Sequence, residues 1–125
     1  MRLPFWLRRS KPPTTTDIQH DVCSRFGAKC HPVALGSKVG IALQTRGIQP
    51  LNGLRHPPEG GTCGWYLWWG NTFTEDVEFF QALHVEHLPD HCPDVMPYLS
   101  LPPGWRIQLA PGYEDVWFDE SLLRV

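Results

Sequence analysis

Apolar side chains near the start of the chain follow a helical period. Ile18, Val22 and Phe26 recur every four residues and so form one apolar stripe. Two residues at the start of this stripe, Thr16 and Asp17, are suitable N-caps. The pattern therefore predicts a helix over residues 16–26 that is covered along one side.

Farther along, short apolar runs with a period of two are typical of strands. Val39, Ile41 and Leu43 share one face of such a run. Residues 47–62, rich in glycine, proline and asparagine, are predicted to form a long loop. The predicted strands span residues 39–43, 65–69, 105–109 and 115–118, and the last two are joined as a hairpin.

The run over residues 65–69 is apolar on both sides. In a strand, Trp65, Leu67 and Trp69 line one face, and Tyr66 and Trp68 line the other. A strand with one face in water alternates apolar and polar residues instead. This strand is therefore either covered on both faces, as aromatic strands more often are, or covered on one face and used for binding on the other. We assign the first three side chains to a face covered by helices, and leave Tyr66 and Trp68 for a loop or a partner.

Short helices complete the predicted fold. Thr74 can cap a helix over residues 75–81, residues 83–88 form a strand or a loop, and residues 89–99 suit one or two helical turns. Residues 1–16, basic and rich in proline and threonine, are predicted to be a flexible tail before a single domain over residues 17–125. We expect an α+β domain with an antiparallel sheet of about four to five strands and short helices packed on one face.

Composition narrows the class of protein. The chain has 125 residues, of which 42% are hydrophobic, enough for one core. No apolar run approaches the roughly 20 residues of a membrane span, and the N-terminus lacks the apolar region of a secretory signal. We therefore expect a cytoplasmic protein without disulfides. The alternative, a secreted protein, needs two bridges that the sequence does not specify among Cys23, Cys30, Cys63 and Cys92.

Charge is spread unevenly along the chain. Residues 1–50 carry eight Lys/Arg against two Asp/Glu, whereas residues 51–125 carry three Lys/Arg against eleven Asp/Glu. An acidic surface disfavours nucleic acid and suits a basic protein partner. The same charge serves solubility equally well without any partner.

One segment is rich in potential metal ligands: His84, Glu86, His87, His91 and Cys92. Zinc accepts histidine nitrogen and cysteine sulfur, so a metal-binding or enzymatic domain is an alternative. The spacing matches no paired ligand motif, however, and two prolines interrupt any helical face that would collect these side chains. We expect no metal and no cofactor, with His84 and His87 ordering a loop through hydrogen bonds and Cys92 buried.

No pattern points to catalysis. The adjacent acids at positions 114–115 and 119–120 point to opposite faces of a strand and so form no acid–base pair. No nucleophile motif surrounds the cysteines. Only Cys63, between Thr62 and Gly64, is expected to lie in an exposed turn. The sequence therefore predicts that the protein is not an enzyme.

Arg55 and His56 stand in the predicted loop. Arg55 is one of three basic residues after position 50. We expect its guanidinium to bind a carboxylate such as Glu86 or Asp119, which would pin the loop beside the tryptophan strand, with His56 helping to order it. Capture of an anionic ligand by Arg55 is the alternative.

Six phrases between positions 39 and 125 combine into a recognisable series. They are GIAL (40–43), PLNGLRHPP (50–58), GWYLW (64–68), LHVEHL (83–88), YLSLPPGWR (98–106) and YEDVWFD (113–119). In this order they resemble the immunity-protein domain of bacterial polymorphic toxin systems known as immunity protein thirty-three-like. Residues 1–38 take no part in the resemblance.

The resemblance implies a cytoplasmic protein that binds and neutralises a toxin and has no catalytic residues. The acidic half of the chain favours a basic toxin as the partner, with no nucleic acid and no membrane involved. Aromatic side chains dominate many binding surfaces. The side chains expected to contact the toxin are Tyr66, Trp68, Glu86, Glu114, Asp115 and Asp119. Besides the metal-binding or enzymatic alternative, a structural domain without a toxin partner stays open.

Overall fold

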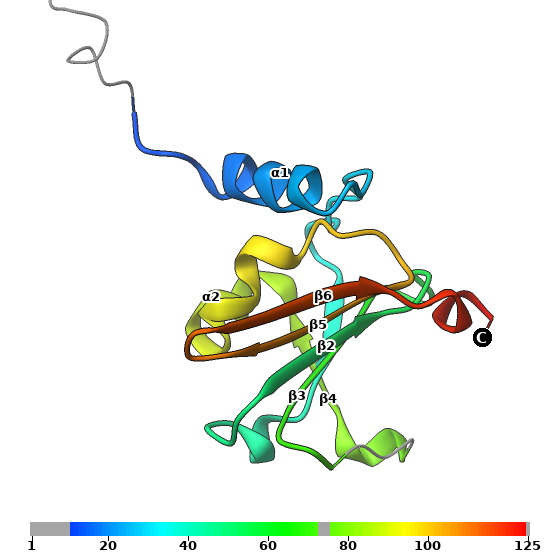
Figure 1. Ribbon diagram of the computed structural model, residues 1–125. Coiled ribbons are helices and arrows are strands. Elements are labelled where there is room, and N and C mark those ends of the chain that lie inside the picture. The colour runs from blue at the N-terminus through cyan, green and yellow to red at the C-terminus, as the bar shows by residue number, and fades with distance from the viewer. Residues whose placement is uncertain (1–10, 73–75, 125) are drawn as a thin grey trace, which may run out of the picture.

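A six-stranded sheet forms the centre of the protein, with helices on one side of it (Figure 1). The computed structural model describes residues 11–72 and 76–124. The strand order is β4-β1-β3-β2-β5-β6, in which β1 and β3 are parallel and the other neighbours antiparallel. The predicted α+β class is confirmed, with six strands in the sheet.

The elements are short and follow one another closely. The α-helices and strands are α1 (Thr15–Arg25), β1 (Lys38–Ile41), β2 (Leu51–Arg55), β3 (Thr62–Trp69), β4 (Gln81–His84), α2 (Leu88–His91), β5 (Trp105–Ala110) and β6 (Tyr113–Phe118). The 3₁₀ turns are η2 (Leu43–Thr45), η3 (Val77–Phe79), η4 (Val85–His87), η5 (Pro93–Tyr98) and η6 (Glu120–Leu123).

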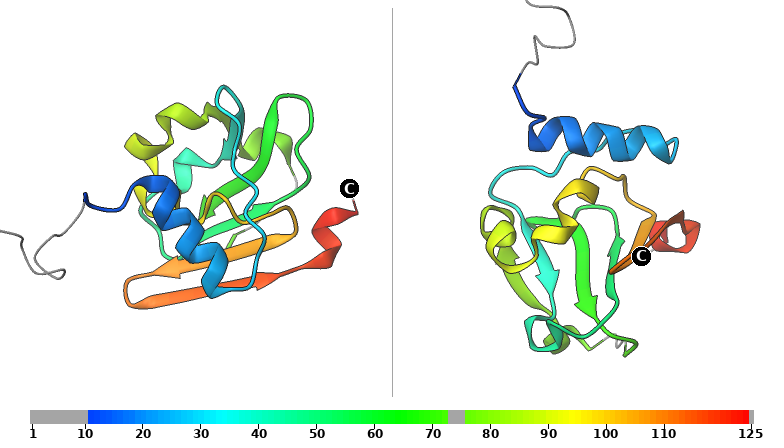
Figure 2. Two further views of the ribbon diagram at one scale, coloured as in Figure 1. Left: turned by 90° about the horizontal axis from the view of Figure 1, so that it is seen from above. Right: turned by 60° about the vertical axis from the view of Figure 1, so that its left-hand side comes forward.

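Helix α1 begins one residue earlier than predicted. The Asp17 N–H donates to Thr14 Oγ1 at 3.1 Å, and the Thr14 N–H donates to the Asp17 carboxylate at 3.0 Å. This capping box satisfies two backbone donors at once, so Thr14 is the cap and the prediction of Thr16 or Asp17 was wrong. Figure 2 shows α1 on the side of η5 away from the sheet, where Gln19 Nε2 donates to the Met96 carbonyl.

The predicted loop over residues 47–62 was wrong, because it contains β2, a central strand between β3 and β5. Its loop-forming residues are used for packing. A Cβ on Gly53 would lie 2.9 Å from Ile107 and 3.0 Å from Leu67, so only glycine fits there. The Asn52 side chain donates to the Gly70 carbonyl at 2.7 Å and accepts from Gln108. Asn52 and Gly53, residue types that are common in turns, therefore stabilise a buried strand here through hydrogen bonds and close packing.

The two faces of β3 belong to two cores. Trp65, Leu67 and Trp69 are buried in the larger core, together with residues of α1, α2 and η5. Their assignment to the helix-covered face is confirmed. On the opposite face, Trp68 and Tyr66 join a smaller cluster with Ala42, Leu54, Phe79, Phe80 and Leu122. Strand β3 is thus covered on both sides.

Other predictions have mixed outcomes. The helical turns over 89–99 appear as α2 and η5, and the C-terminal hairpin is formed by β5 and β6. The helix predicted over residues 75–81 is wrong where it is described, because Asp76 caps the short turn η3 and β4 begins at Gln81. Its expected cap, Thr74, and residues 1–10 of the predicted tail lie outside the described residues.

Candidate functional site

Arg55 is a buried structural residue. It is the last residue of β2, on the core face, and only 1% of its surface is exposed. Its Nε donates to the Cys63 carbonyl at 3.0 Å, and its Nη1 donates to the carbonyls of His31, Leu99 and Leu101 at 2.6, 3.2 and 2.8 Å. Burial lowers the pKa of this guanidinium. The expected pairing with Glu86 or Asp119 is therefore wrong, and the side chain is out of reach of an anionic ligand.

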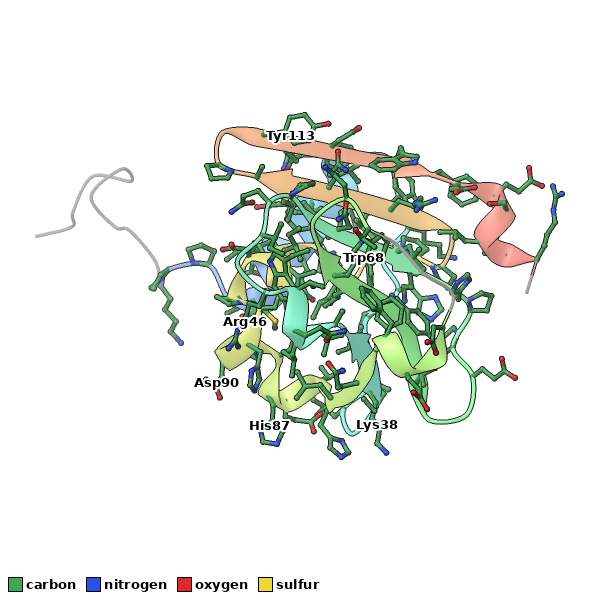
Figure 3. All side chains as sticks on the ribbon, turned by 90° about the horizontal axis from the view of Figure 1, so that it is seen from below. Lys38, Arg46, Trp68, His87, Asp90 and Tyr113 are labelled. Atoms are coloured by element: carbon green, nitrogen blue, oxygen red, sulfur yellow. The ribbon has the colours of Figure 1, made fainter. Side chains whose placement is uncertain are left out.

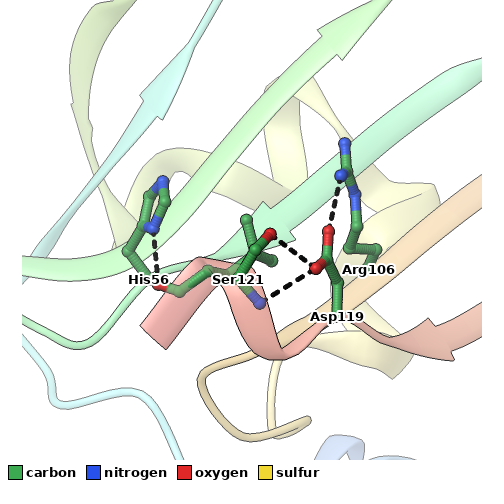
Figure 4. A network of polar contacts seen from close by, with 5 residues as sticks. His56, Arg106, Asp119 and Ser121 are labelled. Carbon is green, nitrogen blue, oxygen red and sulfur yellow. Dashed lines mark hydrogen bonds and ion pairs between the residues drawn. The ribbon is translucent and has the colours of Figure 1, made fainter. Parts of the chain in front are cut away.

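His56 and Asp119 fasten the C-terminal turn to the sheet (Figure 4). His56 Nδ1 donates to the Leu122 carbonyl at 2.9 Å. The Asp119 carboxylate accepts from Ser121 Oγ at 2.6 Å and from Arg106 Nη1 at 2.9 Å. The bond from the Ser121 hydroxyl and the bond from Arg106 lower the pKa of Asp119. These side chains hold η6 in place.

The histidine-rich segment does not gather into a metal site. The rings of His84 and His87 meet edge to face with centroids 6.5 Å apart. Cys92 is buried, and Arg46 Nη1 donates to His91 Nδ1 at 3.3 Å. Across residues 11–72 and 76–124, no group of three or more His, Cys, Asp or Glu side chains is placed to hold a metal ion. Glu86 instead accepts a hydrogen bond from the Gly36 N–H at 2.7 Å.

Cys63 is buried rather than exposed in a turn. Strand β3 begins at Thr62, so the Cys63 side chain points into the larger core and is 3% exposed. Burial raises the pKa of its thiol, which makes the thiolate rare at neutral pH. The expectation of an exposed thiol at this position was wrong.

The two aromatic residues predicted to contact a partner lie inside the smaller cluster. Tyr66 is partly buried between His56 and Phe80, with ring centroids 5.7 and 5.2 Å away. Trp68 is 5% exposed and meets the Phe80 ring edge to face. Both rings therefore stabilise the second face of the sheet, and Trp68 has little surface to offer a partner.

Exposed aromatic side chains occur instead on β6, the strand at one edge of the sheet. Tyr113, Trp117 and Phe118 are 49%, 37% and 49% exposed. Tyr113, Asp115 and Trp117 alternate along the strand and so share one face. We call these three residues the outer strip. Figure 3, which views the sheet from below, shows Tyr113 on the outermost strand and Trp68 nearer its centre.

The acids around the outer strip differ in their partners. Within the described part of the chain, no cation pairs with Asp115. Glu114, on the opposite face of β6, is held by Arg25 and by the Tyr98 hydroxyl, which both donate to it. These bonds lower the pKa of Glu114, and burial with the same contact raises the pKa of Tyr98 to about 12. Asp115 thus keeps a carboxylate that a partner can use.

Sequence reasoning found Glu114, Asp115 and Asp119 but missed the aromatic residues beside them. The available signal was the acid between two aromatic residues at every second position, Tyr113, Asp115 and Trp117, because a polar side chain on one face of a strand indicates that this face meets solvent. What the pattern does not reveal is that β6 lies at the edge of the sheet.

Comparison with known proteins identifies the family to which this chain belongs. No helix within the described residues is long and apolar enough to cross a membrane. No curated protein and no solved structure matches the chain. The family profile described as the Imm33-like domain matches residues 18–119, which covers most of helix α1 and the whole sheet. The expectation that residues 1–38 take no part in the resemblance was therefore wrong from residue 18 onward. The chain therefore belongs to the Imm33-like domain family.

Proposed function

We propose that this protein is an immunity protein that binds a cognate bacterial toxin in the cytoplasm and neutralises it. The observation that carries the proposal is the family match over residues 18–119. Blocking a toxin requires a surface to bind it and no catalytic residues of its own. The function proposed is therefore binding, without enzymatic activity.

The outer strip is the surface that best fits this function. Aromatic side chains on a rigid strand bury much area and lose little conformational freedom, so they make good anchors in a protein interface. Tyr113 and Trp117 are exposed and are held by the β5–β6 pairing. The unpaired Asp115 between them favours a basic partner.

Among the residues first expected to contact the toxin, the acids next to β6 fit this surface best. Asp119 follows β6 at the border of this surface, and Glu114 lies on the other face of the same strand, so with their existing ion pairs both are rim residues. Glu86 follows β4 at the opposite edge of the sheet, so a toxin centred on the outer strip would contact it only by spanning the sheet. Tyr66 and Trp68 then support the sheet that carries the contact.

Co-expression tests the function. Candidate toxins encoded next to the gene are expressed in a sensitive host with and without this protein, and growth is measured. We expect the protein to restore growth and to elute with one of these toxins as a complex in size-exclusion chromatography. Failure to rescue growth or to form a complex with any neighbouring toxin would contradict the proposal.

A matched pair of variants then tests the surface. Trp117→Ala removes an exposed anchor, whereas Leu35→Ala removes a side chain that is 87% exposed in the segment between α1 and β1. We expect weaker rescue from the first variant and full rescue from the second. Equal rescue by both variants would remove the outer strip from the interface.

A further inference from the structure

A cavity of about 490 Å³ lies next to the outer strip. It is formed where η5 faces the ends of β2 and β3 and the turn of the β5–β6 hairpin. Its lining includes the apolar side chains Leu51, Trp69 and Leu109 and the tyrosines Tyr98 and Tyr113. This volume is typical of sites that take a small ligand or a side chain of a partner.

The walls of the cavity are held in place. Pro93, Pro97 and Pro111 contribute to the lining, and each has a fixed φ angle. The Tyr98 hydroxyl donates to Glu114, which Arg25 holds from α1, so the Tyr98 ring is fixed as well. A preformed cavity binds at low cost in conformational entropy.

The charge of the lining favours a cation. Asp94 is the one charged residue among those that line the cavity. Within the described residues it forms no ion pair, and its side chain is exposed. Three aromatic residues, Trp69, Tyr98 and Tyr113, also line the cavity, and aromatic ring faces attract cations. A site that combines leucine side chains with one free carboxylate suits a side chain that is apolar along its stem and positive at its end.

We propose that this cavity binds an arginine side chain from the partner protein, with the guanidinium at Asp94 and the stem along Leu51 and Leu109. Arginine fits better than lysine because its planar guanidinium stacks on aromatic rings and binds a carboxylate through two hydrogen bonds. The inference rests on the proposed function, since it names the chemistry by which the toxin is recognised.

The cavity and the outer strip lie on opposite faces of the β5–β6 hairpin and meet at Tyr113, beside its turn. Tyr113 belongs to both, and along β6 it is followed by Asp115 and Trp117. A basic partner that places one arginine in the cavity reaches Asp115 by passing around the edge of the hairpin at Tyr113. The molecule has its own example of this chemistry: the Arg106 guanidinium lies 5.8 Å from the Trp117 ring centroid. A second copy of this chain is disfavoured as the occupant, because it would bring the same carboxylates together.

Titration with a short peptide tests the cavity without the toxin. The ¹⁵N-labelled full chain is titrated with acetyl-Gly-Arg-Gly-amide and with the same peptide carrying citrulline, which has the shape of arginine without its charge. The indole N–H signal of Trp69, identified through Trp69→Phe, reports binding. We expect the arginine peptide to bind at millimolar concentration and at least threefold more tightly than the citrulline peptide.

Matched variants localise the effect. Asp94→Asn removes the carboxylate of the cavity, and Asp90→Asn removes an exposed carboxylate of α2 outside its lining. We expect arginine affinity to fall at least threefold in the first variant and to stay unchanged in the second. Equal binding of both peptides, or unchanged affinity of Asp94→Asn, would overturn the inference.

The toxin assay separates the two proposals. If the protein neutralises a toxin, Asp94→Asn should weaken toxin binding at least tenfold and Asp90→Asn should not. Neutralisation with equal toxin affinity for wild type and Asp94→Asn would overturn the cavity and leave the proposed function standing. If no toxin is neutralised, the proposed function fails and the peptide titration still decides the cavity. A dimer that Asp94→Asn dissociates, seen by analytical ultracentrifugation, would replace the partner protein with a second copy.

Discussion

Strands β3 and β6 are both rich in aromatic residues, yet they have opposite roles. In β3, Trp65, Trp68 and Trp69 are at most 8% exposed, whereas in β6 Tyr113 and Trp117 are 49% and 37% exposed. The cause is their place in the sheet, because β3 lies between β1 and β2 with a cluster on each face and β6 lies at the edge. Aromatic density therefore marks the core of this protein, and aromatic exposure marks its candidate interface.

Trp65→Ala should have the largest effect on stability. The side chain is fully buried, and its Nε1 donates to the Leu99 carbonyl at 2.9 Å. Removing it leaves a cavity and takes away one of the two donors to that carbonyl, the other being Arg55, so we expect the free energy of unfolding to fall by about 3–5 kcal/mol. Urea denaturation measures the loss. A loss below about 1 kcal/mol would show that β3 is not the centre of the core.

Arg55→Met should cost about 3 kcal/mol in the free energy of unfolding. The substitution keeps an apolar stem but removes a donor from four backbone carbonyls, of which that of Leu99 still accepts from Trp65 Nε1. Urea denaturation again gives the change, and Arg46→Met, at an exposed arginine, serves as the control. Equal losses from the two substitutions would mean that water replaces the guanidinium at no cost.

Trp117→Ala should weaken toxin binding but change stability little, whereas Trp65→Ala should mainly lower stability. Because the side chain is at the surface of β6, we expect a change in the free energy of unfolding of about 1 kcal/mol or less. The affinity for the toxin should fall at least tenfold, which corresponds to about 1.4 kcal/mol. Calorimetric titration with the purified toxin measures this affinity. A strongly destabilised variant, or one with wild-type affinity, would break the contrast between the two strands.

Glu114→Gln should have the smallest effect, and the effect should depend on pH. The folded-state pKa of Glu114 lies below its unfolded value, near 4.5, because of Arg25 and Tyr98. Its contribution is therefore present above about pH 4.5 and is lost as pH falls through the folded-state pKa. For a partly exposed pair we expect about 0.5 kcal/mol at pH 7. Urea midpoints at pH 7 and pH 3 should differ less in the variant than in the wild type.

Much of the fold follows from local patterns, and the failures have a common cause. The period of two in β3 and in the hairpin, and the stripe of α1, were sufficient to predict those elements. Strand β2 was missed because Asn52 and Gly53 are turn formers, and the residues that they pack against, Gly70 and Ile107, are distant in the sequence. Arg55 was paired with the wrong groups because a carbonyl acceptor leaves no signature in a sequence.

Of the candidate site, only the acidic residues could be predicted from the sequence. The acids near the C-terminus indicated a basic partner, but the cavity depends on η5 meeting the β5–β6 turn, and that contact is tertiary. Tyr66 and Trp68 were predicted to contact a partner because their strand is rich in aromatic residues. Exposure depends instead on which strand lies at the edge of the sheet.

The hydrogen bonds of Arg55 have a consequence for how the domain unfolds. Its four acceptors lie in three separate segments: the connection from α1 to β1, strand β3, and the stretch after η5. Local unfolding of any one of these segments would leave the buried Arg55 guanidinium without some of its hydrogen-bond acceptors. Partial unfolding is therefore costly in free energy. We therefore expect them to behave as one cooperative unit, with backbone amides of β2 and β3 exchanging with solvent only when the whole domain unfolds.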